Sequence, residues 1–240
     1  MEKQQLLYEG KAKRIYATDD TDVLWVVYKD DATAFNGEKK DVLEGKARLN
    51  NEISSLIFSQ LSEEGMNSHF IKRLSETEQL VQKVEIVPLE VVVRNIVAGS
   101  MAKRLGIEEG TPLSKPIVEF YYKDDELGDP LITEEHIDLL QAASEEEVSQ
   151  LKIMASSVNT HLLTLFSKID IRLVDFKLEF GRTKDGQLLL ADEISPDTCR
   201  LWDQHTNERF DKDLFRRNIG NLQAGYQEIL TRLGGQSCSK

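Results

Sequence analysis

Hydrophobic and polar residues alternate with a period of two in several short stretches of the chain. In the first third these stretches read "LLYEG", "AKRIYAT" and "DVLWVVYK", and turn-forming residues such as "TDDTD" separate them. Short β-prone runs with turns between them predict an antiparallel sheet. Further along, "EQLVQKVEIVPLEVVVRN" predicts a pair of apolar strands around Pro88, and residues 118–123, "VEFYYK", predict another strand.

Three other stretches have the period of an amphipathic helix. Residues 46–64 carry a broad apolar stripe and end at Gly65, a typical helix stop. Ser144 and Glu147 form a capping-box pattern that opens a long helix. A last helix is predicted over about 212–233 and stops at Gly234 and Gly235. The core positions expected in this last helix are Phe215, Ile219, Leu222, Tyr226, Ile229 and Leu233.

The order of these elements predicts the fold class. Strands dominate the beginning of the chain and mixed elements follow, which is typical of an α+β protein. We expect an N-terminal antiparallel sheet lobe over residues 1–83 and a larger α+β lobe over residues 84–240. No Pro/Gly-rich linker marks the boundary, so the two lobes should be closely apposed.

One alternating stretch carries charges on its polar face. In "LVDFKLEFG", residues 173–181, Asp175, Lys177 and Glu179 alternate with apolar residues. This pattern predicts a strand with one apolar and one charged face. A strand face exposed to solvent explains the charges as well as a ligand site does, and the pattern alone leaves both open.

The partner strand lies in "LLLADEISPDTCRLWD", residues 188–203, after the Asp185–Gly186 pair. Asp-Gly favours a two-residue type I′ turn, and in that register Glu179 faces Asp192. Facing side chains have Cβ atoms about 5 Å apart, so the two carboxylates would repel unless a cation lies between them. Mg²⁺, which prefers oxygen ligands, would relieve this repulsion. A shift of one residue in register would move Asp192 to the other face.

Composition and charge narrow the class of protein. The 240 residues are 40% hydrophobic and 30% charged without repeats, as in an ordinary globular protein. No apolar stretch approaches the ~20 residues of a membrane span, and the N-terminus lacks a signal-peptide core, so we expect a cytoplasmic protein. Two cysteines are too few for a disulfide framework or a cysteine-based zinc site. A net charge of −12 argues against broad nucleic-acid binding.

Cations gather in two further places. In "YEGKAKRIY", residues 8–16, Gly10 predicts a turn, and Lys11 and Lys13 follow on one face of the next strand. They would cover nucleotide phosphates or simply face solvent. In residues 88–106, Gly99 and Ser100 precede a short basic helix, and a helix start with a serine is a common phosphate site.

The alternative for residues 88–106 is a capped helix beside a buried Glu90–Arg94 pair. Cys199 has no base motif beside it, and the scattered histidines show neither zinc spacing nor a catalytic triad. We therefore expect core or surface roles for Cys199, His69, His136, His161 and His205.

Four of these segments together resemble a known family. "YEGKAKRIY", "VVVRNIVAGSMAKRLG", "LVDFKLEFG" and "DEISPDTCRLWD" closely resemble, in this order, the motifs of the SAICAR synthase family of purine biosynthesis. The resemblance implies a two-lobed fold related to ATP-grasp and kinase-like proteins, with ATP between the lobes, and a homodimer. It also implies a ligase that converts ATP, L-aspartate and carboxyaminoimidazole ribotide (CAIR) into SAICAR, ADP and phosphate with Mg²⁺.

The resemblance also implies roles for individual residues. For ATP it implies a phosphate cover at Gly10, Lys11, Ala12 and Lys13, an adenine hinge at Lys83 and Val84, and magnesium and nucleotide contacts at Glu179 and Asp192. For the ribotide it implies phosphate contacts at Arg94, Ser100 and Arg200, contacts to the reacting end at Asp175, Lys177 and Asp197, and further contacts at Lys123 and Asp129. Asn36 stands where some relatives carry Asp, so an acid or metal role is not carried over to it.

These roles suggest a mechanism and two rival functions. Mg²⁺ on Glu179 and Asp192, with Lys11, Lys13 and Lys177, would let the ribotide carboxylate be phosphorylated. The aspartate amine would then attack the acyl phosphate, with Asp175 as a proton acceptor, and Asp175, Lys177 and Asp192 are the expected catalytic residues. Direct amine attack before phosphoryl transfer stays open. The rivals are a small-molecule kinase, for which no "HRD"-like loop is present, and a non-catalytic binding module.

Overall fold

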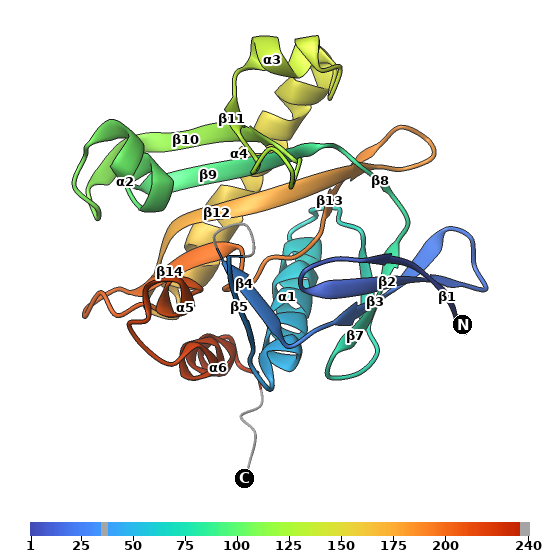
Figure 1. Ribbon diagram of the computed structural model, residues 1–240, viewed down its shortest axis with the longest axis horizontal. Coiled ribbons are helices and arrows are strands. Elements are labelled where there is room, and N and C mark those ends of the chain that lie inside the picture. The colour runs from blue at the N-terminus through green and yellow to red at the C-terminus, as the bar shows by residue number, and fades with distance from the viewer. Residues whose placement is uncertain (35–37, 236–240) are drawn as a thin grey trace.

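A computed structural model describes residues 1–34 and 38–235, and Asn36 and Cys238 lie outside the described residues. The first sheet holds five antiparallel strands in the order β1-β2-β3-β7-β6, at the lower right of Figure 1. As predicted, the first three strands coincide with the alternating runs near the N-terminus. The strands are β1 (Lys3–Glu9), β2 (Lys13–Thr18), β3 (Val23–Tyr28), β7 (Glu78–Gln82) and β6 (Phe70–Arg73).

The second sheet is larger and lies across the upper part of Figure 1. Its central strand, β12 (Ile171–Arg182), pairs with four others, and every strand pair is antiparallel. The other strands are β8 (Glu85–Ile86), β9 (Leu89–Ile96), β10 (Pro112–Tyr122), β11 (Leu131–Ile132), β13 (Leu188–Ala191) and β14 (Cys199–Asp203). A separate pair is formed by β4 (Asp31–Ala34) and β5 (Lys39–Val42).

Two of the three long helices, α1 (Lys46–Glu63) and α4 (Glu145–Ser167), pack on these sheets, and α6 (Leu222–Arg232) packs on α1. α1 contacts both β3 and α6, and α4 covers β9, β10 and β12. Ser144 caps α4 as predicted, because its side chain accepts a hydrogen bond from the Glu147 N–H. The shorter helices are α2 (Gly99–Leu105), α3 (Glu134–Leu139) and α5 (Asp213–Arg217). None of the described helices combines the length and the apolar composition that a membrane crossing needs.

The largest hydrophobic core joins the second sheet to the three long helices, while Val26, Tyr28 and Val81 of the first sheet form a smaller cluster with Ala47 of α1. Ile53 and Phe58 of α1, Leu162 of α4 and Phe176 of β12 belong to the same buried cluster as Tyr226 of α6. At about 25 cal/mol per Å² of apolar surface, each such side chain contributes roughly 1.5–3 kcal/mol to folding. The α+β class is confirmed. The strands of the first sheet end at Gln82 and those of the second begin at Glu85, but α1 packs into the shared core, and the lobe boundary near residue 83 stays a prediction.

The prediction of a single last helix was wrong. The chain breaks between α5 and α6 at Asn218, which has a left-handed φ of 55°, and Ile219, expected in the core, is 53% exposed. Asn221 then starts α6, because its side chain accepts a hydrogen bond from the Ala224 N–H. The stretch expected to form a strand pair around Pro88 contains three strands instead: β7 belongs to the first sheet, and β8 and β9, on either side of Pro88, each pair with β12 of the second sheet rather than with each other.

The predicted register of the β12–β13 hairpin was off by one residue. Glu179 lies opposite Ala191 rather than Asp192. The loop has three residues, 184–186, and closes with Gly186 at φ 78°, because an Asp-Gly pair serves a type I turn with a glycine bulge as well as a type I′ turn. Asp192 follows the end of β13 with a left-handed φ of 58°. The proximity of Glu179 and Asp192 must therefore be judged from their contacts.

Candidate active site

Two connected chambers lie at the junction of the two sheets. The larger chamber has a volume of about 610 Å³ and the smaller one about 350 Å³. Lys177 and Asp197 line both, so the chambers share a wall. The other residues that line both chambers are Lys11, Thr33, Glu90, Asp129, Thr198 and Lys212.

The larger chamber is apolar at one end and charged at the other. The first sheet contributes Ile15, Leu24, Val26 and Val81, and Val84 lies beside them. Val84 packs directly over Gly181, where a Cβ atom would come within 2.3 Å of its side chain. The charged end is lined by Lys13, Lys123, Lys177, Glu179, Asp192 and Glu193. Such a chamber suits a ligand with a flat apolar ring and an anionic tail.

Lys177 connects the carboxylates of the charged end. Its Nζ lies 2.5 Å from Glu179 Oε1, 3.0 Å from Glu90 Oε1 and 3.8 Å from Asp192 Oδ2. Burial opposes its charge, but the surrounding carboxylates outweigh burial and raise the pKa of Lys177 well above its usual value. Glu179 and Asp192 thus come together, through a shared lysine and not by facing each other across the hairpin.

Lys13 holds the two carboxylates that follow β13. Its Nζ lies 2.6 Å from Asp192 Oδ1 and 3.4 Å from Glu193 Oε2. Although burial acts in the opposite direction, Lys13 and Lys177 keep the pKa of Asp192 well below its usual range. For Glu193 burial prevails and raises the pKa. Its buried Oε2 accepts no hydrogen bond from the described residues.

The smaller chamber is built around Arg94 of β9. Its guanidinium, only 3% exposed, donates to Asp175 Oδ2 at 2.7 Å, to Glu119 Oε2 at 2.7 Å and to Tyr121 Oη at 3.0 Å. It also donates to Ser100 Oγ at 3.2 Å, at the first turn of α2. The expected Glu90–Arg94 pair is not formed, because Glu90 pairs with Lys177 instead.

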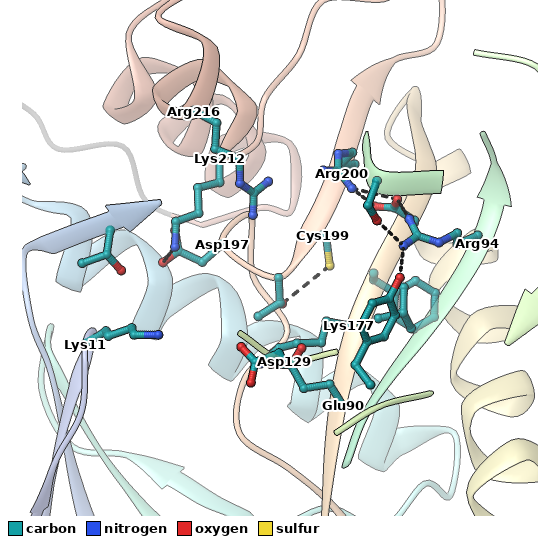
Figure 2. Close-up of a pocket in the computed structure, with 17 residues that line it drawn as sticks. Lys11, Glu90, Arg94, Asp129, Lys177, Asp197, Cys199, Arg200, Lys212 and Arg216 are labelled. Atoms are coloured by element: carbon teal, nitrogen blue, oxygen red, sulfur yellow. Dashed lines mark hydrogen bonds and ion pairs between the residues drawn. The ribbon is translucent and has the colours of Figure 1, made fainter. Parts of the chain in front are cut away.

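Arg200 of β14 lies beside Arg94 (Figure 2). Its Nη1 donates to Asp175 Oδ2 at 2.8 Å, and its Nε donates to Asp213 Oδ2 at 3.1 Å. Asp175 therefore binds two guanidinium groups at once. Gly99, at φ 55°, admits Arg200, because a Cβ atom there would lie 2.4 Å from Arg200 Nη2. The chamber thus presents fixed cations, a serine hydroxyl and a helix start to an anion.

Asp197 is held in place by residues for which the sequence predicted no role in the site. Lys46 Nζ lies 2.7 Å from Asp197 Oδ2, and the Tyr226 hydroxyl donates to Oδ1 at 2.5 Å. Both partners are fully buried. Lys212 adds a contact at 3.3 Å, and Lys212 and Lys46 hold the pKa of Asp197 well below its usual range against the effect of burial. Lys46 lies in an apolar helical stripe, where no sequence pattern distinguishes it from a solvent-facing lysine.

Most of the predicted site residues line one of the chambers. Gly10, Ala12 and Lys13 line the larger chamber, and Lys11 lies in the turn before β2, where its Nζ contacts Asp125 Oδ1 at 2.7 Å. Lys123 lies 3.0 Å from Glu179, and Asp129 lines both chambers. Lys83 is not among the residues that line either chamber in the described part of the chain. Its N–H donates to the Asp22 carbonyl.

His69 also lines the larger chamber, although only a core or surface role was expected for it. Its Nε2 donates to the Asp192 carbonyl at 3.1 Å, since that carbonyl can only accept. Burial, helped by Lys13, lowers the pKa of His69 to about 4. Cys199 is buried in the hydrophobic core as expected, and it also lines the smaller chamber.

The lowered pKa of His69 predicts a loss of stability in acid. The unfolded chain takes up a proton near pH 6.5 and the folded chain only near pH 4, so the free energy of unfolding falls as the pH falls through this window. The contribution is about 3 kcal/mol at 1.36 kcal/mol per pH unit. Urea unfolding of wild type and His69→Gln at pH 7 and pH 4 measures it. The variant should lose less stability, while exposed His205→Gln should match wild type; identical losses in all three would contradict the prediction.

The fit of Mg²⁺ can be judged from the donor set. Among residues 1–34 and 38–235, no three His, Cys, Asp or Glu side chains gather closely enough to hold a metal by themselves. Mg²⁺, however, usually takes only one or two protein carboxylates and completes its shell with water and phosphate oxygens. Glu179 and Asp192 supply such a pair beside Lys177, and Glu193 Oε2, which makes an ion pair with Lys13 but no hydrogen bond in the described residues, shares that lysine with Asp192. The site therefore fits a magnesium ion that arrives with a nucleotide.

Comparisons with known proteins show the family to which the chain belongs. The family model described as SAICAR synthetase matches residues 6–233. A phosphoribosylaminoimidazole-succinocarboxamide synthase from Shouchella clausii is 72% identical over 235 residues, 98% of each chain. The solved synthase from Ehrlichia chaffeensis superposes with a TM-score of 0.94 at 47% identity, covering 97% of this chain and 100% of its own. A SAICAR synthetase (Type-2) in complex with ADP gives a TM-score of 0.93 at 48% identity, covering 97% and 99%. With its sequence and its fold both matched over nearly their full length, the chain belongs to the SAICAR synthetase family.

Proposed function

We propose that the two chambers divide the substrates of a SAICAR synthase between them, with ATP in the larger chamber and CAIR in the smaller one. As a member of its family the chain is an ATP-dependent ligase of purine biosynthesis, which joins L-aspartate to the carboxylate of CAIR and forms SAICAR, ADP and phosphate. The observation that carries the proposal is the shared wall at Lys177 and Asp197, because it lets a triphosphate and a carboxylate meet.

The larger chamber has the profile of an ATP site. The apolar end formed by the first sheet and Val84 suits an adenine ring, and the lysines at the other end suit phosphates. A relative of 48% identity has been solved in complex with ADP, which supports a nucleotide in this chain. Gly10, Lys11, Ala12 and Lys13 would cover the phosphates from the first sheet.

The smaller chamber has the profile of a ribotide site. Arg94, Ser100 and Arg200 present a guanidinium pair and a hydroxyl to a phosphate, while Lys177 and Asp197 lie towards the ATP side. Asp175 accepts hydrogen bonds from both Arg94 and Arg200. Because both of its carboxylate oxygens already accept from guanidinium groups, this geometry favours a role for Asp175 in orienting the two arginines over the role of proton acceptor.

The reaction requires two anionic groups to meet, the carboxylate of CAIR and the γ-phosphate of ATP. In the first step a carboxylate oxygen of CAIR attacks the γ-phosphorus of ATP, and ADP leaves. In the second step the aspartate amine attacks the acyl carbon, phosphate leaves, and one proton is released. Lys13, Lys123 and Lys177 line the charged end of the larger chamber, where the triphosphate would end, and they would offset the repulsion of the reacting groups. Otherwise the protein acts by positioning the substrates, and none of its own side chains forms a covalent bond with them.

Magnesium is part of the proposal. Glu179 and Asp192 would hold the ion together with the nucleotide phosphates. Bound there, Mg²⁺ would neutralise phosphate charge during phosphoryl transfer. The homodimer, the cytoplasmic location and the binding of aspartate and CAIR by this chain are likewise predictions.

The requirement for aspartate separates this ligase from a small-molecule kinase. Incubation with ATP, CAIR and L-aspartate should give SAICAR and ADP in equal amounts, because the amine consumes each acyl phosphate. Without aspartate no SAICAR should form, and ADP should stay near the background. Both products can be quantified by chromatography. A stable phosphorylated product that accumulates without aspartate would contradict the proposal and favour the kinase.

A further inference from the structure

One buried carboxylate, that of Asp213, contacts four arginines. Asp213 is the first residue of α5 and is only 1% exposed. Its Oδ1 accepts from Arg216 Nη1 at 2.8 Å, and its Oδ2 accepts from Arg200 Nε at 3.1 Å and from Arg209 Nη1 at 3.3 Å. Arg217 Nε lies 3.6 Å from the same Oδ2. No other carboxylate within residues 1–34 and 38–235 pairs with as many cations.

Two of the four arginines line the smaller chamber. Arg200 and Arg216 are among the lining residues drawn in Figure 2, whereas the other two line neither chamber and share a second carboxylate, Glu109. In the described part of the chain Arg216 pairs with no carboxylate other than Asp213. Loss of the Asp213 charge would therefore leave Arg216 without a partner and Arg200 with Asp175 alone.

The backbone fixes Asp213 relative to Arg200. Asp211, which is fully buried, accepts a hydrogen bond from the Asp213 N–H at 2.8 Å and another from the Leu201 N–H at 2.9 Å. Leu201 directly follows Arg200, so the Asp211 side chain connects the start of α5 to the strand that carries Arg200. Burial opposes the charge of Asp213, but Arg200 and Arg216 outweigh burial and lower the pKa of Asp213 to about 2, so its carboxylate is ionised at neutral pH.

The contacts of Arg200 leave one of its donors for a ligand. A guanidinium binds an oxyanion through a planar fork of N–H groups, so the direction of that plane decides how well it binds. Asp213 accepts from Nε and Asp175 accepts from Nη1, which fixes the plane at two points. Nη2 makes no hydrogen bond within the described residues and is not among their enclosed polar atoms that lack a partner. This free donor can therefore reach an anion in the chamber that Arg200 lines.

From these contacts we propose that Asp213 is a positioning residue of the ligase reaction, which sets the affinity for CAIR by fixing the planes of Arg200 and Arg216. The inference rests on the proposed function, which places the ribotide phosphate beside Arg200. Asp213 itself lines neither chamber, so it acts through the two arginines. The KM for CAIR should therefore depend on Asp213, while the KM for ATP, which would bind in the larger chamber, should not.

Two substitutions of Asp213 test this role in steady-state kinetics, with each substrate varied in turn. Asp213→Asn keeps the shape of the side chain and removes its charge, and it should raise the KM for CAIR about tenfold or more, because it weakens two charge-assisted hydrogen bonds. The kcat and the KM for ATP should change by less than about threefold. Asp213→Glu keeps the charge but displaces the carboxylate by one methylene group, and it should raise the KM for CAIR by a smaller factor, about threefold.

A double variant tests whether Asp213 acts through Arg200. When Asp213→Asn is added to Arg200→Met, the KM for CAIR should rise further by less than about threefold, because residues that act through one contact are not additive. Asp203→Asn is the matched control. Asp203 is a buried carboxylate of the same strand as Arg200, pairs with Arg232 and lines neither chamber, so its variant should keep the KM for CAIR of the wild type.

Several outcomes would overturn the proposal. One is an unchanged KM for CAIR in the Asp213 variants, and another is an equal rise in the KM for ATP. A full additional tenfold rise in the double variant would show that Asp213 does not act through Arg200. If neither Asp213 variant folds, Asp213 serves the fold and not the site, and the proposal is again wrong. Failure of the proposed function is seen separately, because the wild type itself would then form no SAICAR.

Discussion

Replacing Asp192 with asparagine should lower turnover by roughly a hundredfold or more while leaving the fold intact. The carboxylate lies between Lys13 and Lys177 at the proposed triphosphate end, and an amide cannot neutralise a metal ion or keep these lysines in place by charge. The backbone should not change, because Asp192 has a φ of 58° and asparagine is among the few residues that tolerate this region. Steady-state kinetics with ATP, CAIR and aspartate measures the effect.

A second measurement distinguishes loss of the metal ion from displacement of the two lysines. ADP should raise the melting temperature of the wild type more strongly with Mg²⁺ than without it, because a ligand that binds the folded state stabilises it by mass action. In Asp192→Asn this magnesium increment should shrink. Asp185→Asn, in the exposed turn of the same hairpin, is the control and should keep both turnover and the increment. Near-normal turnover of Asp192→Asn at saturating Mg²⁺ would refute the metal role.

Replacing Lys46 with methionine should destabilise the protein by about 3 kcal/mol at neutral pH, because it removes one partner of a buried ion pair. Lys46 is fully buried and lies 2.7 Å from Asp197 Oδ2, so no water can take its place without reorganisation of α1. The same change should raise the KM for CAIR, since Asp197 lines both chambers. Urea unfolding and steady-state kinetics provide the two measurements.

The pH dependence identifies the ion pair as the cause. The folded-state pKa of Asp197 is depressed, so the pair stabilises the protein above the unfolded value near 4 and this stability is lost only as the pH falls further. The difference between wild type and Lys46→Met should therefore be largest above pH 5 and shrink below pH 4. Lys152→Met breaks an exposed pair with Glu134 and should cost less than about 1 kcal/mol. If the loss of stability in Lys46→Met does not vary with pH, lost packing rather than the lost ion pair is its cause.

Local sequence patterns were reliable where one short segment fixes its own structure. The capping box at Ser144 and the stripe of α1 depend on contacts within a few residues, and both were predicted correctly. The break at Asn218 was not predicted, because apolar residues recur at helical spacing on both sides of it. The hairpin register was missed because Asp185–Gly186 is compatible with two loop types, and the choice between them is made by the strands that flank it.

Candidate site residues were found where an unusual residue interrupts an apolar pattern, as Asp175 and Glu179 do in β12 and Arg94 does in β9. Sequence patterns did not predict most of the side chains that form ion pairs or hydrogen bonds with the site residues. Lys46 and Tyr226, which hold Asp197, read as ordinary members of helical stripes. Nothing in the local sequence distinguishes a buried lysine that pairs with a distant carboxylate from one that faces solvent.

The sequence by itself determined the family, the α+β class, most strands and helices, and the segments that carry the chemistry. These follow from local preferences and from motifs that are continuous in the chain. Only the tertiary structure decided that Lys177 joins Glu179 to Asp192, that Asp175 binds two arginines and that Asp197 rests on Lys46 and Tyr226. The reason is physical: ion pairs act over a few ångströms between residues far apart in the chain, and only packing of the two sheets and α1 brings those residues within that range.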